Sequence, residues 1–167
     1  MAPPTWVVGQ VLTASDVNTW FVPLVAYKSA DQSLTSNTTL QNDNALSVTV
    51  AANATYWFEL YLNFEGGTTG SSDIKVGWTF PSGLTMRYQD IYADTGAVAR
   101  LAVTDIQTSV IAVGSNGAGN LRAYSARGTV LTSGTSGTLQ LQWAQNTSSG
   151  TATIVHAGSV LMLQRIS

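Results

Sequence analysis

The sequence contains a single histidine, His156, and no cysteine, so few side chains could carry nucleophilic or proton-transfer chemistry. A Ser-His-Asp triad would require His156 together with Asp105 and one of the many serines. No Gly-x-Ser-x-Gly turn is present to expose such a serine at the end of a strand. His156 shares its parity with Ile154 and Val160 in an alternating run. We therefore expect a structural histidine at an interior or interface position rather than a catalytic one.

Carboxylates and glycine-rich segments offer little further chemistry. Glu59 with Asp73 or Asp90 could supply the two carboxylates that glycoside hydrolysis requires, but nothing in the sequence brings them together. Residues 42–44, Asn-Asp-Asn, are the nearest approach to a calcium site, although these residue types are first of all turn formers. Residues 114–119 are rich in glycine but lack the Lys-Ser or Lys-Thr of a phosphate loop. We expect a non-enzymatic protein with no cofactor and no metal.

The composition excludes several classes of partner. Only 10% of the residues are charged, against about 25% in ordinary domains, and the net charge is −2. Seven Lys and Arg residues form no basic patch, so we expect no nucleic-acid binding. We expect no membrane contact, because no apolar run approaches the ~18 residues of a span, and no signal peptide, because the N-terminus lacks a basic region. A surface of neutral polar residues suits a protein that belongs to a large assembly.

From Leu24 onward, apolar and polar residues alternate in short runs that are separated by Gly, Asn and Pro turns. Period-two alternation predicts half-buried antiparallel strands. The runs predict an all-β fold, a jelly-roll sandwich of about 8–10 antiparallel strands. The last two runs, 137–148 and 151–166, are expected to pair as a wide terminal hairpin.

The first residues have a different pattern. Thr13 can cap a helix and Asp16 stands where its side chain can reach back to the cap, while Pro23 ends the helix. A short aromatic helix is not stable alone and must dock on another surface. We therefore divide the chain into an N-terminal attachment arm with a short helix, residues 1–25, and a jelly-roll β-domain, residues 26–167.

The opening TWVVGQVLTASDVNTW resembles that of small virion proteins of phages that infect actinobacteria. The matching residues are Trp6, Gly9, Leu12, Thr13, Ala14, Asp16 and Asn18. The segments DIKVGWTFPSG and GTLQLQWAQNTSSGTATIVHAGSVLMLQRI resemble late strands of the β-domains of those proteins, which are similar to the trimeric jelly rolls of the tumour-necrosis-factor type. The resemblance implies a homotrimeric virion component without catalytic residues. It would be a capsid decoration, head-fibre or minor capsid protein, or a minor tail protein.

Aromatic residues fall on both faces of the run from 55 to 64. Trp57 and Tyr61 have the opposite parity to the apolar even-numbered residues. Three interpretations stay open: contacts at a trimer axis, which we favour, burial under a long loop, or an exposed platform that binds carbohydrate. The residues predicted at the trimer interface are Trp57, Tyr61, Trp143 and His156.

The arm is predicted to attach the protein to a major capsid protein or a tail protein through Trp6, Val8, Trp20 and Phe21. The expected location is the virion, on the outer capsid surface or the tail, after synthesis in the cytoplasm of the bacterial host. The alternative is a minor tail or tail-fibre protein whose β-module binds host surface glycans. A secreted hydrolase fragment is a third hypothesis, which the lack of paired catalytic groups disfavours.

Overall fold

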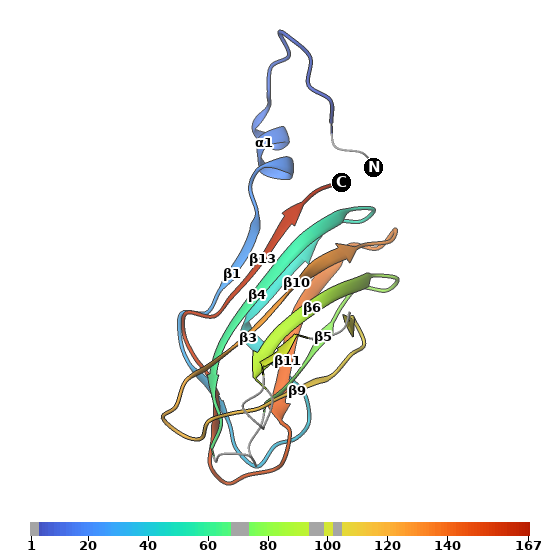
Figure 1. Cartoon of the computed structure of the whole chain (residues 1–167). Helices are drawn as coiled ribbons and strands as arrows, with labels where there is room; N and C mark the ends of the chain where they lie inside the picture. Colours follow the sequence, from blue (N-terminus) through green and yellow to red (C-terminus); the bar gives the residue numbers. More distant parts are fainter. Residues whose placement is uncertain (1–3, 68–73, 94–98, 102–104) are drawn as a thin grey trace.

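Two antiparallel sheets pack face to face as a sandwich, with one short helix outside it (Figure 1). The computed structural model describes residues 4–67, 74–93, 99–101 and 105–167. Within these residues the chain forms thirteen strands and one helix. The all-β jelly-roll prediction is confirmed. The strands outnumber the predicted 8–10 because several have only two to four residues and leave little mark on sequence periodicity.

The larger sheet has nine strands, and its main path runs in the order β1-β13-β4-β10-β6-β7. Short strands complete it, with β12 paired to β2 and β4, and β8 paired to β6. The strands of this sheet are β1 (Leu24–Tyr27), β2 (Gln32–Leu34), β4 (Thr55–Glu65), β6 (Thr85–Ala93), β7 (Ala99–Leu101), β8 (Asp105–Ile106), β10 (Arg122–Leu131), β12 (Thr153–Val155) and β13 (Val160–Arg165).

The smaller sheet has four strands in the order β3-β11-β5-β9. They are β3 (Gln41–Val50), β11 (Gly137–Gln145), β5 (Ile74–Thr79) and β9 (Ile111–Val113). The apolar residues of one parity on each long strand meet between the two sheets. At the centre Phe58 contacts Trp78 and Tyr88 edge-on, with ring centroids 5.9 and 5.8 Å apart. Burial raises the pKa of the Tyr88 hydroxyl, which therefore stays neutral in this core.

The prediction of a terminal hairpin is wrong. Strand β11 pairs with β3 and β5 in the smaller sheet, whereas β12 and β13 pair with strands of the larger sheet. Residues 146–152 therefore cross from one sheet to the other instead of turning within one. Both runs have an apolar face, and the sandwich buries these faces against each other across the core.

The helix α1 (Ala14–Trp20) begins and ends where the sequence predicts. The Thr13 hydroxyl accepts a hydrogen bond from Asp16 N at 3.1 Å, and Asp16 Oδ2 accepts one from Thr13 N at 2.9 Å. The Thr13 hydroxyl, and then its backbone N–H, hold the pKa of Asp16 below its usual range. None of the helices in the described parts of the chain is long and apolar enough to cross a membrane.

The helix docks lightly on the end of β13. Gln164 Nε2 donates a hydrogen bond to the Trp20 carbonyl at 2.8 Å, and the Arg165 guanidinium lies 4.7 Å from the centre of the Trp20 ring. Strand β1 begins at Leu24, which pairs with Leu163, so the sheet already includes the last two residues of the segment 1–25.

Gly128 on β10 leaves no room for a side chain, and we predict that Gly128→Ala destabilises the domain. A Cβ at this position would lie 2.2 Å from the Arg87 carbonyl oxygen and 2.6 Å from Tyr88 Cα, both backbone atoms that cannot move alone. We expect a loss of about 3 kcal/mol or more in the free energy of unfolding, the upper end of typical overpacking costs. Urea denaturation followed by tryptophan fluorescence measures it. Ser125→Ala, on the opposite face of the same strand, is the control and should change little.

Candidate interaction surface

The outer face of the larger sheet, which points away from the smaller sheet, has a row of mostly apolar side chains. The strand register aligns one outward residue from each of five neighbouring strands: Tyr27, Val160, Tyr61, Ser125 and Ile91. We name this set the Tyr61 row. Tyr27, Tyr61 and Ile91 are 60%, 48% and 40% exposed, although each belongs to a regular strand. Exposed apolar groups that lie next to one another across a sheet indicate an interaction surface.

A second row lies beside it and adds charge. Its members, from β1 to β6, are Val25, Met162, Glu59, Arg127 and Gln89. Glu59 and Arg127 stand opposite each other on neighbouring strands and are both exposed. Within the described part of the chain, no ion pair or hydrogen bond joins them. Each charge therefore stays open to a partner on another molecule.

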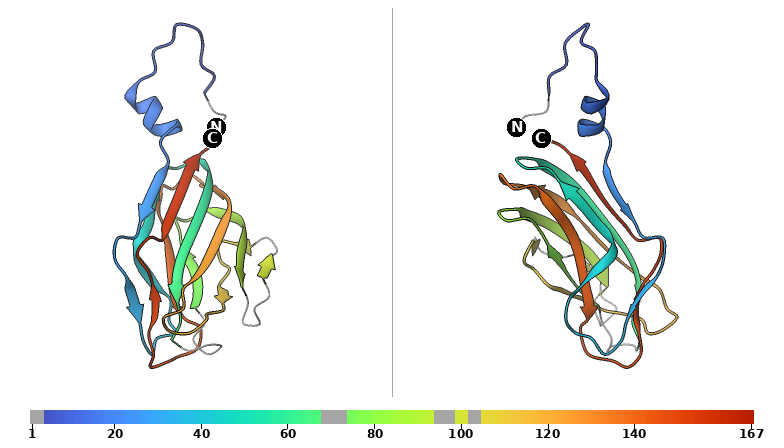
Figure 2. Two further views of the ribbon diagram at one scale, coloured as in Figure 1. Left: turned by 60° about the vertical axis from the view of Figure 1, so that its left-hand side comes forward. Right: turned by 180° about the vertical axis from the view of Figure 1, so that it is seen from behind.

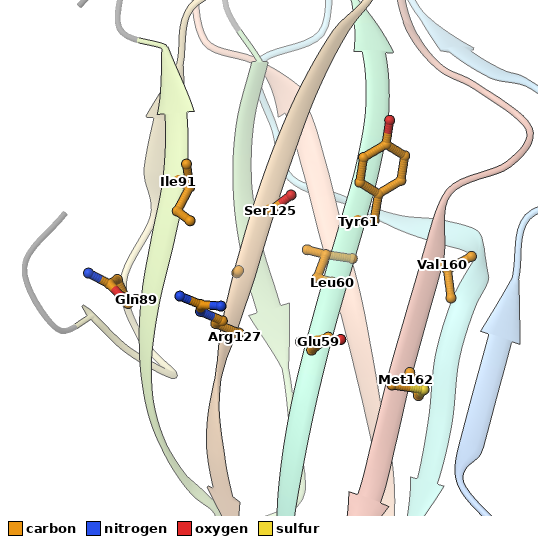
Figure 3. Close-up of a pocket in the computed structure, with 10 residues that line it drawn as sticks. Glu59, Leu60, Tyr61, Gln89, Ile91, Ser125, Arg127, Val160 and Met162 are labelled. Carbon is orange, nitrogen blue, oxygen red and sulfur yellow. The ribbon is translucent and has the colours of Figure 1, made fainter. Parts of the chain in front are cut away.

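The two rows line a shallow groove with a volume of about 400 Å³ (Figure 3). Its residues come from β4, β6, β10 and β13, and the Tyr61 ring stands at one side of the groove with Arg127 and Gln89 across from it. Trp57, in the next row, is 41% exposed and faces the same way. The sequence predicted the outward parity of Trp57 and Tyr61, and the structure places both on this one face.

Trp143 does not belong to this surface, and its assignment to the trimer interface is wrong. Its side chain has 0% exposure and lies between the two sheets. The indole Nε1 donates a hydrogen bond to Asp43 Oδ2 at 3.1 Å. Trp143 shares its parity with Leu139 and Leu141, and that face of β11 is the core face of the protomer, so Trp143 contacts no second copy.

His156 lies apart from the Tyr61 row, in the turn between β12 and β13. Its ring is 19% exposed, with Nδ1 3.2 Å from Asp31 Oδ2 and Nε2 3.6 Å from Glu65 Oε2. The carboxylate of Glu65 also accepts a hydrogen bond from Gly119 N at 3.1 Å. Sequence reasoning missed this cluster, because Asp31 is 125 residues away and only the sheet pairing brings it close. No group of three His, Asp or Glu residues suited to a metal ion occurs among the described residues.

The arm presents a second candidate surface. Figure 2 shows α1 and the segment before it projecting beyond one end of the sandwich. Trp6 and Phe21 stack with ring centroids 6.3 Å apart, yet Phe21 stays 55% exposed and Val8 is fully exposed. The exposed large apolar residues that precede β1 are Val7, Val8, Val11, Leu12, Val17, Phe21 and Val22. Of the four predicted attachment residues, Trp20 is the one that contacts the β-domain.

No protein-family model and no curated protein matches the sequence. Among solved structures, the chain is similar to one from the tripod of the baseplate of bacteriophage Tuc2009, at 14% identity and a TM-score of 0.40, over 98% of this chain and 74% of that chain. It is also similar to a chain of infectious bursal disease virus, Gx strain, at 13% identity and a TM-score of 0.23, over 98% of this chain and 45% of that one. At these scores the function has to be argued from the surfaces of the chain itself.

The contact between Asp31 and the β12–β13 turn predicts an acid-sensitive contribution to stability. The Ala157 N–H, which donates to Asp31 Oδ1 at 2.8 Å, is the main cause that lowers the pKa of Asp31, and the His156 ring adds to it. Because the pKa of Asp31 is lower in the folded protein than in the unfolded chain, its ionised carboxylate stabilises the fold above about pH 4. This stabilisation is lost as the pH falls further and the carboxylate takes up a proton. The difference in melting temperature between wild type and Asp31→Asn should therefore shrink between about pH 6 and about pH 3.

The pKa of Asp31, measured by NMR titration, separates the two causes. In His156→Gln it should stay below the usual range, because the backbone N–H of Ala157 remains. A difference in melting temperature that is constant over this pH range would contradict the assignment.

Proposed function

We propose that the protein is a non-enzymatic structural protein of a phage virion, which forms a homotrimer through the outer face of its larger sheet and attaches through its arm. The observation that carries this proposal is the outer face itself, where Trp57 and Tyr61 stay exposed on β4, a strand inside the sheet, in line with exposed Tyr27 and Ile91. The first choice of role is a capsid decoration, head-fibre or minor capsid protein. A minor tail protein is the alternative.

The chemistry of the outer face favours a second copy of the chain as its occupant. Glu59 and Arg127 are adjacent opposite charges that form no ion pair with any residue the structure describes, so a rotated copy can place Arg127 against Glu59. Such pairs contribute about 0–1 kcal/mol while exposed and mainly fix orientation. The apolar rows supply the affinity, at about 25 cal/mol per Å² before ordering costs. A net charge of −2 opposes association only weakly.

We propose three copies, rather than two or another number, because the sequence resembles proteins with trimeric jelly rolls. Closed cyclic symmetry lets a surface of this kind be buried completely in a ring of copies. The arms of the three protomers would then leave the same end of the assembly, where several of them can bind neighbouring capsid or tail subunits at once. Multiple attachment raises the overall affinity without any new contact within one arm.

A second candidate function rests on the groove of about 400 Å³. An exposed aromatic ring beside Gln and Arg side chains is a combination that suits a sugar, with the ring against its apolar face and the polar groups on its hydroxyls. Tyr61, Gln89 and Arg127 supply these groups. A monomer that binds host surface glycans would use the same face that the trimer would cover.

The oligomeric state tests the proposal directly. Light scattering after size exclusion should give about three times the chain mass of 17.6 kDa. Tyr61→Arg should shift the protein to the monomer, because it places a positive charge in the Tyr61 row, next to the row that already contains Arg127. The control is Thr49→Arg, which also changes an exposed position but lies on β3 of the other sheet, and it should leave the trimer intact. A wild-type monomer that binds bacterial polysaccharide would favour the glycan-binding alternative.

Removal of the arm tests attachment. A chain that lacks residues 1–23 keeps β1 whole and loses only the helix and its few contacts with β13. We expect this variant to stay folded and trimeric by circular dichroism and light scattering, and to be absent from particles in a co-sedimentation assay. If the truncated protein still binds particles, the attachment site lies in the β-domain. If it aggregates, the arm is part of the hydrophobic core of its own protomer.

A further inference from the structure

A lysine is completely buried at the end of β1, among groups that could react with it. Lys28 Nζ lies 2.9 and 3.1 Å from the two carboxylate oxygens of Asp43, and both side chains have 0% exposure. The same nitrogen lies 2.5 Å from Asn44 Oδ1 and 3.2 Å from Gln32 Oε1. The contact with Asn44 is shorter than an ordinary N–H···O hydrogen bond, so the amine stands very close to the side-chain amide.

An irregularity in β3 creates this arrangement. Opposite β11, Gln140 pairs with Ser47 and Gln142 pairs with Asn42, so the four residues from 43 to 46 face Leu141 alone. In a regular strand consecutive side chains point to opposite faces, but a bulge re-aims them. Here the side chains of both Asp43 and Asn44 reach Lys28.

The bulge is held firmly by hydrogen bonds. Asp43 Oδ1 accepts from the backbone N–H groups of Ala45 and Leu46, each at 2.9 Å. The Asp43 carbonyl accepts from Gln140 Nε2 at 2.8 Å. The lysine is fixed as well, since the Lys28 N–H donates to the Ser159 carbonyl at 2.9 Å. An amine and an amide that are held in contact lose little entropy on the way to a transition state.

From this geometry we propose that Lys28 and Asn44 form an intramolecular isopeptide bond, with Asp43 as the proton carrier. The reaction needs no cofactor and no second substrate. The Lys28 amine replaces the side-chain amino group of Asn44, and the products are a secondary amide and one molecule of ammonia.

The reaction consists of a proton transfer, an attack, a second proton transfer and the loss of ammonia. Lys28 passes one proton from its ammonium group to Asp43, which leaves a neutral amine and a neutral acid in the apolar interior. The amine lone pair attacks Cγ of Asn44, while the Asp43 acid donates a hydrogen bond to the developing oxyanion. The amine nitrogen then gives its proton through Asp43 to the Nδ2 group. The bond between Cγ and Nδ2 breaks. The released ammonia takes the proton that Asp43 still holds and leaves as ammonium toward solvent, to which Asn44 is exposed, and Asp43 returns to its carboxylate form.

The two other neighbours of the amine are poorer targets. Attack on the carboxyl group of Asp43 would expel water and would use up the group that carries the proton. Gln32 has a reactive amide of the same type, but its oxygen is farther away at 3.2 Å and also accepts a hydrogen bond from Asn44 N at 2.9 Å. The bond is therefore assigned to Asn44.

Intact-mass spectrometry of the full-length protein tests the proposal. The folded wild type should be lighter than its sequence mass by one ammonia molecule. Asn44→Ala changes an exposed residue and keeps the buried ion pair, so it should fold and show its full sequence mass. Tryptic mapping of the wild type should show no cleavage after residue 28 and one branched peptide that joins residues 28 and 44.

Lys28→Arg separates the crosslink from other losses of ammonia. The sequence contains Asn116 followed by Gly117, a pair that can close to a succinimide with the same mass change. Arginine keeps the positive charge but cannot form the amide, so this variant should show its full mass. A folded wild type at its full sequence mass would overturn the proposal. So would a mass loss that persists in Asn44→Ala or Lys28→Arg, and so would a branched peptide at Gln32.

Discussion

The burial of one face of every long strand against the opposite sheet is the constraint on which the rest of the structure depends. Phe58 illustrates it, because its ring meets Trp78 of the smaller sheet and Tyr88 of its own sheet at the centre of the sandwich. Once the inward parity is fixed, every second residue must point outward. The side chains on the outer face are then free to serve interactions with other molecules, and aromatic residues there are informative about function.

The core also contains a buried ion pair, which is stabilised by hydrogen bonds rather than by apolar contact. Lys28 and Asp43 have 0% exposure, and a buried ion pair stabilises a fold only when its remaining hydrogen-bond groups are satisfied. The structure meets that condition through Trp143 Nε1 and the backbone N–H groups of the bulge. Removing one partner of such a pair typically costs about 3–5 kcal/mol, so this interior site contributes strongly to holding the bulge in β3. The proposed reaction between Lys28 and Asn44 would therefore begin from groups that are already held in place.

The sequence predicts local features well and the pairing of distant segments poorly. The capping box of Thr13 and Asp16 and the outward parity of Trp57 could be predicted, because each depends on neighbouring residues. The partners of β11 could not, because parity shows which face is buried but not which sheet the strand joins. The parity of Trp143 likewise does not distinguish a contact within the core from a contact between subunits.

The sites that depend on long-range contacts were missed in the same way. Asp31 meets His156 across 125 residues, and Lys28 meets Asp43 through a bulge that has no periodic signature. The residue types Asn and Asp at positions 42–44 predict a turn. The segment does interrupt a strand, but Asp43 is buried, and Lys28, which directly follows β1, contacts Asp43 and Asn44.

The C-terminal strand β13 ends beside α1, at the same end of the sandwich, whereas the connection at 146–152 lies at the far end (Figures 1 and 2). A passenger domain fused to Ser167 would therefore be held close to whatever the arm contacts. A peptide inserted among residues 146–150, which are largely exposed, would be displayed at the opposite end of the sandwich from that contact. As an engineered display scaffold, the protein offers its inter-sheet connection rather than its terminus as the site for cargo.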